Sequence, residues 1–430
     1  MERPHIFSYL LAAGFLVILA RRRSTGRAAP LWPLIPLQIA WTNLHGSFLM
    51  GPLLAGLAAA AEAIEGLLLG LAPATASRDR NPAAPREAAR PHLREAGTLA
   101  VITALLTVSC MANPYGARLL LFPFQLLGSS FMRENYEWLP PFGSDFSSTY
   151  MMRYYVVWSV LGLGVLAAAL VRVVRRGLRP PAGAFPPGGL FPLLVFAALL
   201  SLSLRMQRNV TDFALGTLPG VAATASWLLP CGPPRAARRP WLPATALLLA
   251  ALAAWFGWHG YPYRAGSRRP LGFGLGRNIP VAAADYVEEN GLRGNAFNTY
   301  AAGAYLVYRF YPWVRVGMDS RNDVYGPELY HRYLRALAEP DVLARMLETL
   351  DASFVFLEWS AVPSGRILED LGRMGWRLVY FDDSIAILLR AGGPWSALAA
   401  RDGYAVLDPQ RYVRTMPKID DPDRAFQEAA

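Results

Sequence analysis

Long apolar runs alternate with short arginine-rich segments over the first 260 residues. Blocks of about 18 apolar residues have the length that a helix needs to cross a bilayer. The second run is much longer, and as one straight helix it would reach roughly 60 Å, about twice the hydrocarbon thickness. It must fold back on itself, so the pattern predicts about eight spans. The runs lie at 5–20, 31–71, 97–113, 151–171, 190–204, 210–229 and 242–258.

The fold-back falls in "WTNLHGSF", residues 41–48, where polar residues interrupt the second run. The pattern predicts a helical hairpin with its turn at 43–47, which places Asn43 and His45 at the membrane surface. Two interpretations stay open. The segment is either a turn in which Gly46 permits close packing and His45 is hydrogen-bonded, or a polar contact with the headgroup of a bound substrate.

Arginine-rich segments set the expected orientation, because they favour the cytoplasmic side of a membrane. With eight spans all four such segments fall on one side, whereas counting 31–71 as a single span would separate them. Asn43, His45, a loop at 113–150 and everything after Trp258 are then expected at the exterior. The four segments are "RRRSTGR" (21–27), "RDRNPAAPREAARPHLRE" (78–95), "RVVRRGLR" (172–179) and "RAARR" (235–239).

After Trp258 the pattern becomes that of a globular domain. Short β-rich runs such as "SFVFLE" alternate with helical stretches such as "DVLARMLETL". This alternation favours a small α/β domain with a mostly parallel sheet. We expect an α-helical polytopic membrane domain at 1–260, a linker at 261–278, an extracytoplasmic α/β domain at 279–392 and a C-terminal tail at 393–430.

Composition agrees with a membrane protein. The chain is 53% hydrophobic and only 17% charged, whereas soluble domains carry about a quarter charged residues. All of the net charge of +11 comes from the first 260 residues, because the rest of the chain has nearly equal numbers of basic and acidic residues. Basic charge beside apolar blocks favours cytoplasmic loops over nucleic-acid binding. The two cysteines do not have the spacing of a zinc site.

The segment "RMQRN" at 205–209 places Arg205, Arg208 and Asn209 between two apolar runs. Arginines at a membrane surface can bind a phosphate or diphosphate headgroup bidentately. Asp212 follows inside the next run, where an ionisable group is costly and usually paired or functional. An ion pair between Arg208 and Asp212, four residues apart, is the structural alternative.

Two other segments carry candidate residues. "MDSRNDVYG" at 318–326 follows a predicted strand, so Asp319 and Arg321 are candidates for ligand binding at a strand end. Turn and N-cap roles are the structural alternative for this segment. Glu137, in the loop at 113–150, is a candidate base or metal ligand, and a solvated surface acid is the alternative.

Five segments together point to a known group: "RPHIFSYLL", "WTNLHGSFLMG", "NPYGARLLLFP…EWLPP", "RMQRN" and "FNTYAAGAYLVYRFYPWVRVGMDSRNDVYG". They resemble bacterial polytopic glycosyltransferase-like membrane proteins of the GT-C superfamily, related to the dolichyl-phosphate-mannose protein mannosyltransferases. The resemblance covers nearly the whole chain. It implies a multi-pass protein of the bacterial inner membrane that takes a sugar from a polyprenyl-phosphate carrier at the exterior face. The family carries an acidic catalytic loop before the segment matching "RPHIFSYLL", and this N-terminal catalytic portion is expected to be lacking here.

The resemblance therefore implies a GT-C-like glycosyltransferase, or a fragment of one, in which Arg205 and Arg208 hold the carrier phosphate and Asn43 and His45 line the cavity. The expected partners are a polyprenyl-phosphate-linked sugar and membrane lipid, without nucleic acid. The alternative is a non-catalytic accessory subunit of envelope polysaccharide or glycan assembly, which would bind other envelope-assembly proteins. No cofactor is evident from the motifs, although the resemblance allows a divalent metal.

Overall fold

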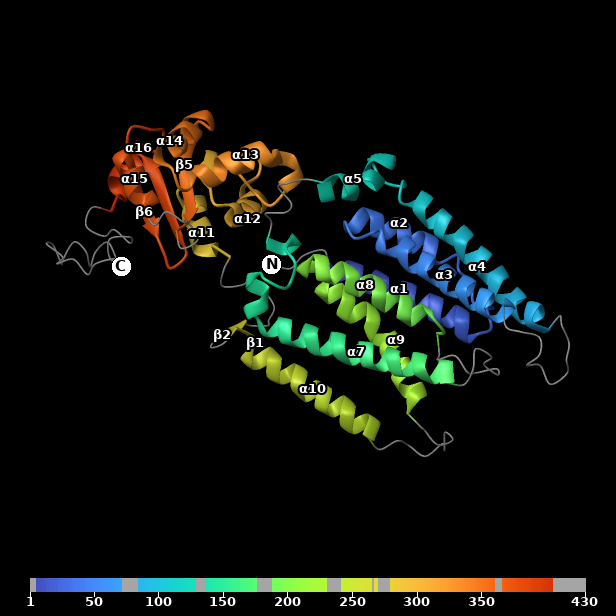
Figure 1. Ribbon diagram of the computed structural model, residues 1–430. Coiled ribbons are helices and arrows are strands. Elements are labelled where there is room, and N and C mark those ends of the chain that lie inside the picture. The colour runs from blue at the N-terminus through green and yellow to red at the C-terminus, as the bar shows by residue number, and fades with distance from the viewer. Residues whose placement is uncertain are drawn as a thin grey trace. The chain divides into compact units, whose positions relative to one another are not determined.

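The computed structural model divides the chain into two compact units, Met1–Gly272 and Phe273–Ala430 (Figure 1). The predicted loop at 113–150, the linker, the tail and three of the arginine-rich segments fall partly or wholly outside the residues that the structure describes. The described residues are 5–71, 84–128, 136–175, 188–229, 241–264, 267–269, 279–359 and 366–404.

The first unit is helical, and its long helices lie side by side (Figure 1). Each predicted apolar run lies on one or two of these helices, and the chain turns between α2 and α3 in the region where a hairpin is predicted. A short β-hairpin follows the last helix. The elements are α1 (His5–Ser24), α2 (Leu34–Leu44), α3 (Met50–Gly70), α4 (Ala84–Ser109), α5 (Ala117–Gly128), η2 (Tyr136–Trp138), η3 (Asp145–Ser148), α7 (Tyr150–Arg175), α8 (Phe191–Arg205), η4 (Gln207–Asn209), α9 (Val210–Leu228), α10 (Trp241–His259), β1 (Tyr261–Arg264) and β2 (Ser267–Arg269).

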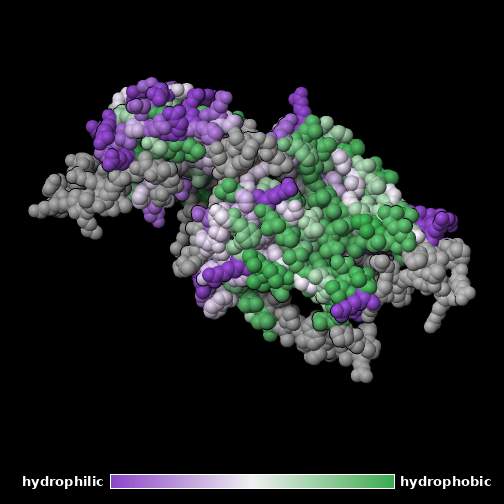
Figure 2. Space-filling model, in the orientation of Figure 1, coloured by the Kyte–Doolittle hydropathy of each residue, from purple (hydrophilic) through white to green (hydrophobic). Residues whose placement is uncertain are grey.

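Three of the described helices, α1, α3 and α7, are long and apolar enough to cross a membrane. The helix α2 has 11 residues, which corresponds to about 16 Å, well short of the hydrocarbon core. The structure thus supports three membrane-crossing helices and not the predicted eight. Hydrophobic residues cover much of the visible face of this unit (Figure 2), as expected for helices that contact lipid. These features indicate association with a membrane.

The core of the first unit contains large aromatic side chains. Phe196 of α8 packs edge-on against Phe213 of α9, with ring centroids 5.0 Å apart. Gly162 allows α7 to approach Phe196, because a Cβ at this position would lie 2.3 Å from the ring. Trp41 of α2 is also fully buried. Aromatic packing of this kind fixes the relative positions of α1, α2, α7, α8 and α9.

The second unit contains a five-stranded sheet with strand order β4-β3-β5-β7-β6. The strands β3, β4, β5 and β6 run in one direction, and β7 is antiparallel to both of its neighbours. Asp382 accounts for the exception, because its side chain caps a tight β6–β7 turn that is too short for a parallel crossover. The strands are β3 (Gly294–Asn298), β4 (Val314–Val316), β5 (Ala352–Glu358), β6 (Trp376–Phe381) and β7 (Ile385–Arg390).

Helices cover both faces of this sheet. Along β5, Phe354 and Phe356 join one buried cluster with α11, α12 and α16, whereas Val355 and Leu357 join a second with α13, α14 and α15. A strand that is buried on both faces reads as a continuous apolar run, which explains "SFVFLE". The prediction of a small region with helices and a sheet is confirmed. The helices are α11 (Val281–Glu289), α12 (Tyr300–Phe310), α13 (Asn322–Ala336), α14 (Pro340–Thr349), α15 (Ile367–Arg373) and α16 (Ser396–Arg401).

Candidate functional site

A hydrogen-bonded cluster joins the beginning of α1 to the turn between α2 and α3. Ser8 is buried, and its Oγ accepts hydrogen bonds from Trp41 Nε1 and Ser47 Oγ, both at 2.9 Å. The Ser8 hydroxyl lies 2.7 Å from His45 Nδ1, so it donates its own proton to that nitrogen. The backbone N–H of Ser47 also donates to His45 Nδ1, at 3.3 Å. Since Nδ1 is the acceptor, a neutral His45 carries its proton on Nε2.

The cluster extends to the segment before α9. The rings of His45 and His5 lie 4.1 Å apart between centroids, and His5 Nε2 lies 3.4 Å from a terminal nitrogen of Arg208. The Arg208 guanidinium also lies over the Trp138 ring, 5.3 Å from its centroid. Residues far apart in the sequence thus place a guanidinium and two imidazoles side by side.

A cavity of about 400 Å³ lies between α1, α3, α8 and α9. Its wall is mostly apolar, and Tyr9 and Asp212 are the polar residues that line it. The Tyr9 ring lies 6.3 Å from the His5 ring between centroids, so the polar part of the cavity adjoins the histidine–arginine cluster. The remaining wall includes Leu16, Val17, Leu54, Leu199 and Leu215. The arrangement combines a hydrocarbon-lined space with cationic and N–H donors at one end.

The structural alternative, a direct ion pair between Arg208 and Asp212, does not form. Asp212 forms no hydrogen bond or ion pair with any residue that the structure describes, and Arg208 contacts His5 and Trp138 instead. The helical spacing argument failed because Arg208 lies in the 3₁₀ turn η4, before α9 begins. The expected packing role of Gly46 is also wrong, because a Cβ there would meet no atom within 4 Å.

Other predicted residues lie around the cluster with different surroundings. Asn43 Nδ2 donates to the carbonyls of Ile39 and Ala112, both at 2.8 Å, and so links α2 to the end of α4. Asn209 Nδ2 donates to the Leu202 carbonyl at 3.3 Å. Arg205 is exposed at the last position of α8, and Glu137 is half-buried in η2. A binding role for each of them stays a prediction.

Asp319 and Arg321 belong to the second unit, where they pair with each other. The Arg321 backbone N–H and Nε donate to the Asp319 carboxylate at 2.8 and 2.9 Å. Burial raises the pKa of Asp319, but hydrogen bonds from Arg321 outweigh it and leave the pKa below its usual value. Both contacts fit a turn that precedes α13, and a ligand role for the pair stays a prediction.

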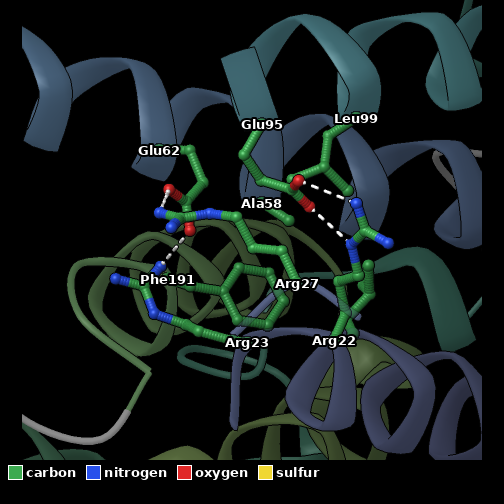
Figure 3. Close-up of a pocket in the computed structure, with 9 residues that line it drawn as sticks. Arg22, Arg23, Arg27, Ala58, Glu62, Glu95, Leu99 and Phe191 are labelled. Carbon is green, nitrogen blue, oxygen red and sulfur yellow. Dashed lines mark hydrogen bonds and ion pairs between the residues drawn. The ribbon is translucent and has the colours of Figure 1, made fainter. Parts of the chain in front are cut away.

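Sequence reasoning missed a second cluster, at the other end of α1 (Figure 3). Glu62 of α3 accepts hydrogen bonds from Arg23 and Arg27, each at 2.9 Å. Glu65, one helical turn further on, pairs with Arg23 and accepts from the Leu190 N–H at 2.7 Å. Arg22 binds Glu95 of α4 bidentately, at 2.8 and 2.9 Å. The arginines that predict a cytoplasmic loop are therefore bound to buried carboxylates.

His92 of α4 completes this cluster, and Glu62, Glu65 and His92 place one ligand atom each within 4.8 Å of one another. Carboxylate and imidazole are suitable donors for a divalent metal. However, Arg23 and Arg27 already neutralise the two glutamates, so a cation would have to displace them. The geometry is that of a closed ion-pair network tying α1, α3, α4 and the chain before α8. Two glutamates three residues apart in an apolar run were the signal in the sequence.

Comparison with known proteins assigns no family, because neither a family model nor a curated protein matches this sequence. The chemistry of the site follows from its own residues. Arg208 and the Nε2–H of His45 can bind an anion at one end of the cavity. The apolar wall can hold a hydrocarbon chain, as ligand sites in helical bundles commonly do.

Proposed function

We propose that this protein is a GT-C-like membrane glycosyltransferase that uses a polyprenyl-phosphate-linked sugar. The observation that carries the proposal is the cavity between α1, α3, α8 and α9, with Arg208, His5 and His45 next to its polar end. A polyprenyl phosphate has the matching construction, a long hydrocarbon attached to an anionic headgroup. The sequence resemblance points to the same class of substrate.

The residues have separate roles in this proposal. Arg208 binds the carrier phosphate, because a guanidinium matches phosphate oxygens in geometry and charge. His45, oriented by Ser8 and Ser47, donates a second hydrogen bond from Nε2. Transfer breaks the bond between the anomeric carbon and the phosphate oxygen and forms a bond from that carbon to the acceptor oxygen. The released polyprenyl phosphate keeps the electron pair of the broken bond as an additional negative charge. Asp212 is the carboxylate in the cavity wall that can take the proton of the acceptor hydroxyl.

The location follows the same proposal. The histidine–arginine cluster opens at the exterior face of a bacterial inner membrane, and the helices shorter than a full span complete the multi-pass domain. The second unit is then extracytoplasmic, where an acceptor or envelope-assembly partner can reach it. The opposite cluster at Arg22, Arg23 and Arg27 faces the cytoplasm, since the positive-inside rule counts arginines even when acidic residues neutralise them.

Two arginines three positions apart allow a matched test. Arg208→Gln removes the guanidinium beside the cavity, whereas Arg205→Gln removes an exposed one at the end of α8. Loss of a charge-assisted hydrogen bond costs about 1.5–3 kcal/mol, which corresponds to roughly 10- to 150-fold weaker binding. We expect this loss for Arg208→Gln and wild-type affinity for Arg205→Gln, a result that would remove the predicted role of Arg205 in carrier binding. Binding of a fluorescent polyprenyl phosphate to protein in nanodiscs measures both, and equal affinities would refute the assignment.

An accessory subunit that holds the carrier for a separate transferase is the second candidate. One observation favours it: Asp212 is the only carboxylate among the described residues that line the cavity. Release of labelled sugar from a polyprenyl-phosphate-linked donor by the purified protein decides between the two. Turnover establishes a transferase, whereas tight binding of the carrier without turnover supports the accessory subunit.

A further inference from the structure

The second unit carries a surface group of aromatic and basic residues that the proposed function does not use. Tyr308, Tyr311 and Trp313 are 79%, 74% and 62% exposed, and they lie within six consecutive positions. Arg293 and Arg315 are exposed beside them. We call these five residues the aromatic–arginine patch.

The patch lies at one edge of the sheet. Tyr308 is on the last turn of α12, Tyr311 follows that helix, and Trp313 directly precedes β4, an edge strand. The Arg293 guanidinium lies 5.0 Å from the centroid of the Trp313 ring. The Gly294 N–H donates to the Trp313 carbonyl at 3.0 Å, which fixes the tryptophan against the beginning of β3. The patch is thus built on ordered backbone.

Packing within the unit does not account for these rings. The side of α12 that packs into the core consists of other residues: Tyr305, Leu306 and Phe310 are buried. Single exposed apolar residues are ordinary, but contiguous ones mark interaction surfaces. Arg309, between Tyr308 and Phe310 in the chain, is held by Asp285 and Glu288. The charges left to an outside partner are therefore those of Arg293 and Arg315.

We propose that the aromatic–arginine patch binds the headgroup region of the membrane that holds the first unit. Tryptophan and tyrosine concentrate at this level of a bilayer because each ring has an apolar body and a polar edge. Arginine beside them can bind lipid phosphates while its methylene stem stays on the apolar surface. The chemistry of the patch therefore matches an interface rich in anionic phospholipid.

The chain itself keeps the second unit close to such a surface. The membrane-crossing helix α7 begins at Tyr150, and β1 contacts this helix near its beginning (Figure 1). The β1–β2 hairpin thus lies at a membrane surface. It ends at Arg269, and the described part of the second unit begins at residue 279. Ten residues span at most about 35 Å, so the chain limits the distance between residue 279 and the hairpin to this value.

The test uses the full-length chain in nanodiscs with one reporter at a time. Tyr308→Cys places an environment-sensitive fluorophore in the patch and leaves its other four members intact. Val324→Cys is the matched control, because Val324 is an exposed apolar residue, 64% exposed, on α13 of the same unit. Both are made with Cys231→Ser, while Cys110 is buried. Lipids that carry a quencher near the headgroup report proximity of each fluorophore to the membrane.

We expect a blue-shifted emission and strong lipid quenching at position 308, and neither at position 324. Adding Tyr311→Ala and Trp313→Ala should abolish quenching at position 308, and Arg293→Gln with Arg315→Gln should weaken it only in anionic nanodiscs. Water-like emission without quenching at position 308, in anionic and zwitterionic nanodiscs alike, overturns the proposal. Protection of position 308 in native membranes but not in nanodiscs also overturns it, in favour of a protein partner. None of these results depends on sugar transfer.

Discussion

Neutralising Glu65 tests whether the cluster at the end of α1 holds the first unit together. The Glu65 side chain is 0% exposed on α3 and pairs with Arg23, which is 24% exposed. In Glu65→Gln the amide can still accept from the Leu190 N–H, but it presents no negative charge to the guanidinium. The substitution therefore isolates the ion pair from the backbone hydrogen bond.

The expected loss of folding stability follows from the contacts of Glu65. Removing one partner of a buried ion pair costs about 3–5 kcal/mol, because the other charge is left uncompensated. Arg23 keeps Glu62 at 2.9 Å, so the lower limit applies, about 3 kcal/mol for Glu65→Gln. Glu65→Ala also leaves the Leu190 N–H without its acceptor, which adds about 1–2 kcal/mol.

Thermal unfolding in mild detergent, followed by tryptophan fluorescence, measures these losses. For a domain of this size about 3 kcal/mol lowers the midpoint by roughly 6–12 °C. Glu87→Gln is the control, because Glu87 is exposed in the first turn of α4, and its loss should cost no more than about 1 kcal/mol. If Glu65→Gln and Glu87→Gln unfold at the same temperature, the network does not stabilise the unit.

Two further predictions concern packing and pH. Gly162→Ala should destabilise the first unit by about 1–3 kcal/mol, because the added Cβ meets the Phe196 ring. Gly164→Ala is the control: its Cβ would have no atom within 4 Å, so it should be neutral or stabilising by up to about 1 kcal/mol. Equal unfolding midpoints of the two variants in the same assay would contradict the close contact between α7 and Phe196. Burial raises the pKa of Glu358 above its ordinary value of 4.5, so its ionised form costs stability at neutral pH. Glu358→Gln should therefore stabilise the second unit at pH 7, with a gain that fades as the pH falls from the raised folded pKa to 4.5. An unfolding midpoint of the second unit that shows no such pH-dependent gain would exclude burial as the cause.

The sequence pattern predicted the helices and the sheet of the second unit, because its buried strands are continuous apolar runs and residues such as glycine mark the ends of its helices. Gly291 follows Asn290, the C-cap residue of α11, and has φ of 62°, as expected of a glycine that ends a helix. The direction of β7 could not be predicted in the same way. It depends on the Asp382 turn, and one side chain capping two N–H groups leaves no periodic signal.

Part of the candidate site was predicted as well, because polar residues stand out in an apolar run, whereas contacts between separate helices leave no such signal. Polar residues in apolar surroundings pointed to His45 and Arg208, and both lie in one cluster. Sequence spacing could not show that Arg208 lies in a 3₁₀ turn against His5 rather than on α9 against Asp212. It also could not show that Glu62 and Glu65 bind the arginines of α1, because that pairing depends on contacts between separate helices. Charges counted in a loop are not necessarily free charges in the fold.

In the proposed mechanism α1 joins both clusters, because it contributes residues to each of them and to the wall of the cavity between them. Ser8 and Arg23 are 15 positions apart on this helix, so the clusters are separated by about 22 Å along its axis, at 1.5 Å per residue. The apolar cavity follows the same helix from Tyr9 to Ala20. In the proposed function, a carrier lipid with its phosphate at Arg208 would extend its hydrocarbon along α1 in the direction of the ion-pair network. Groups this far apart act independently, so we expect Glu65→Gln to change stability without changing carrier binding, and Arg208→Gln to do the reverse.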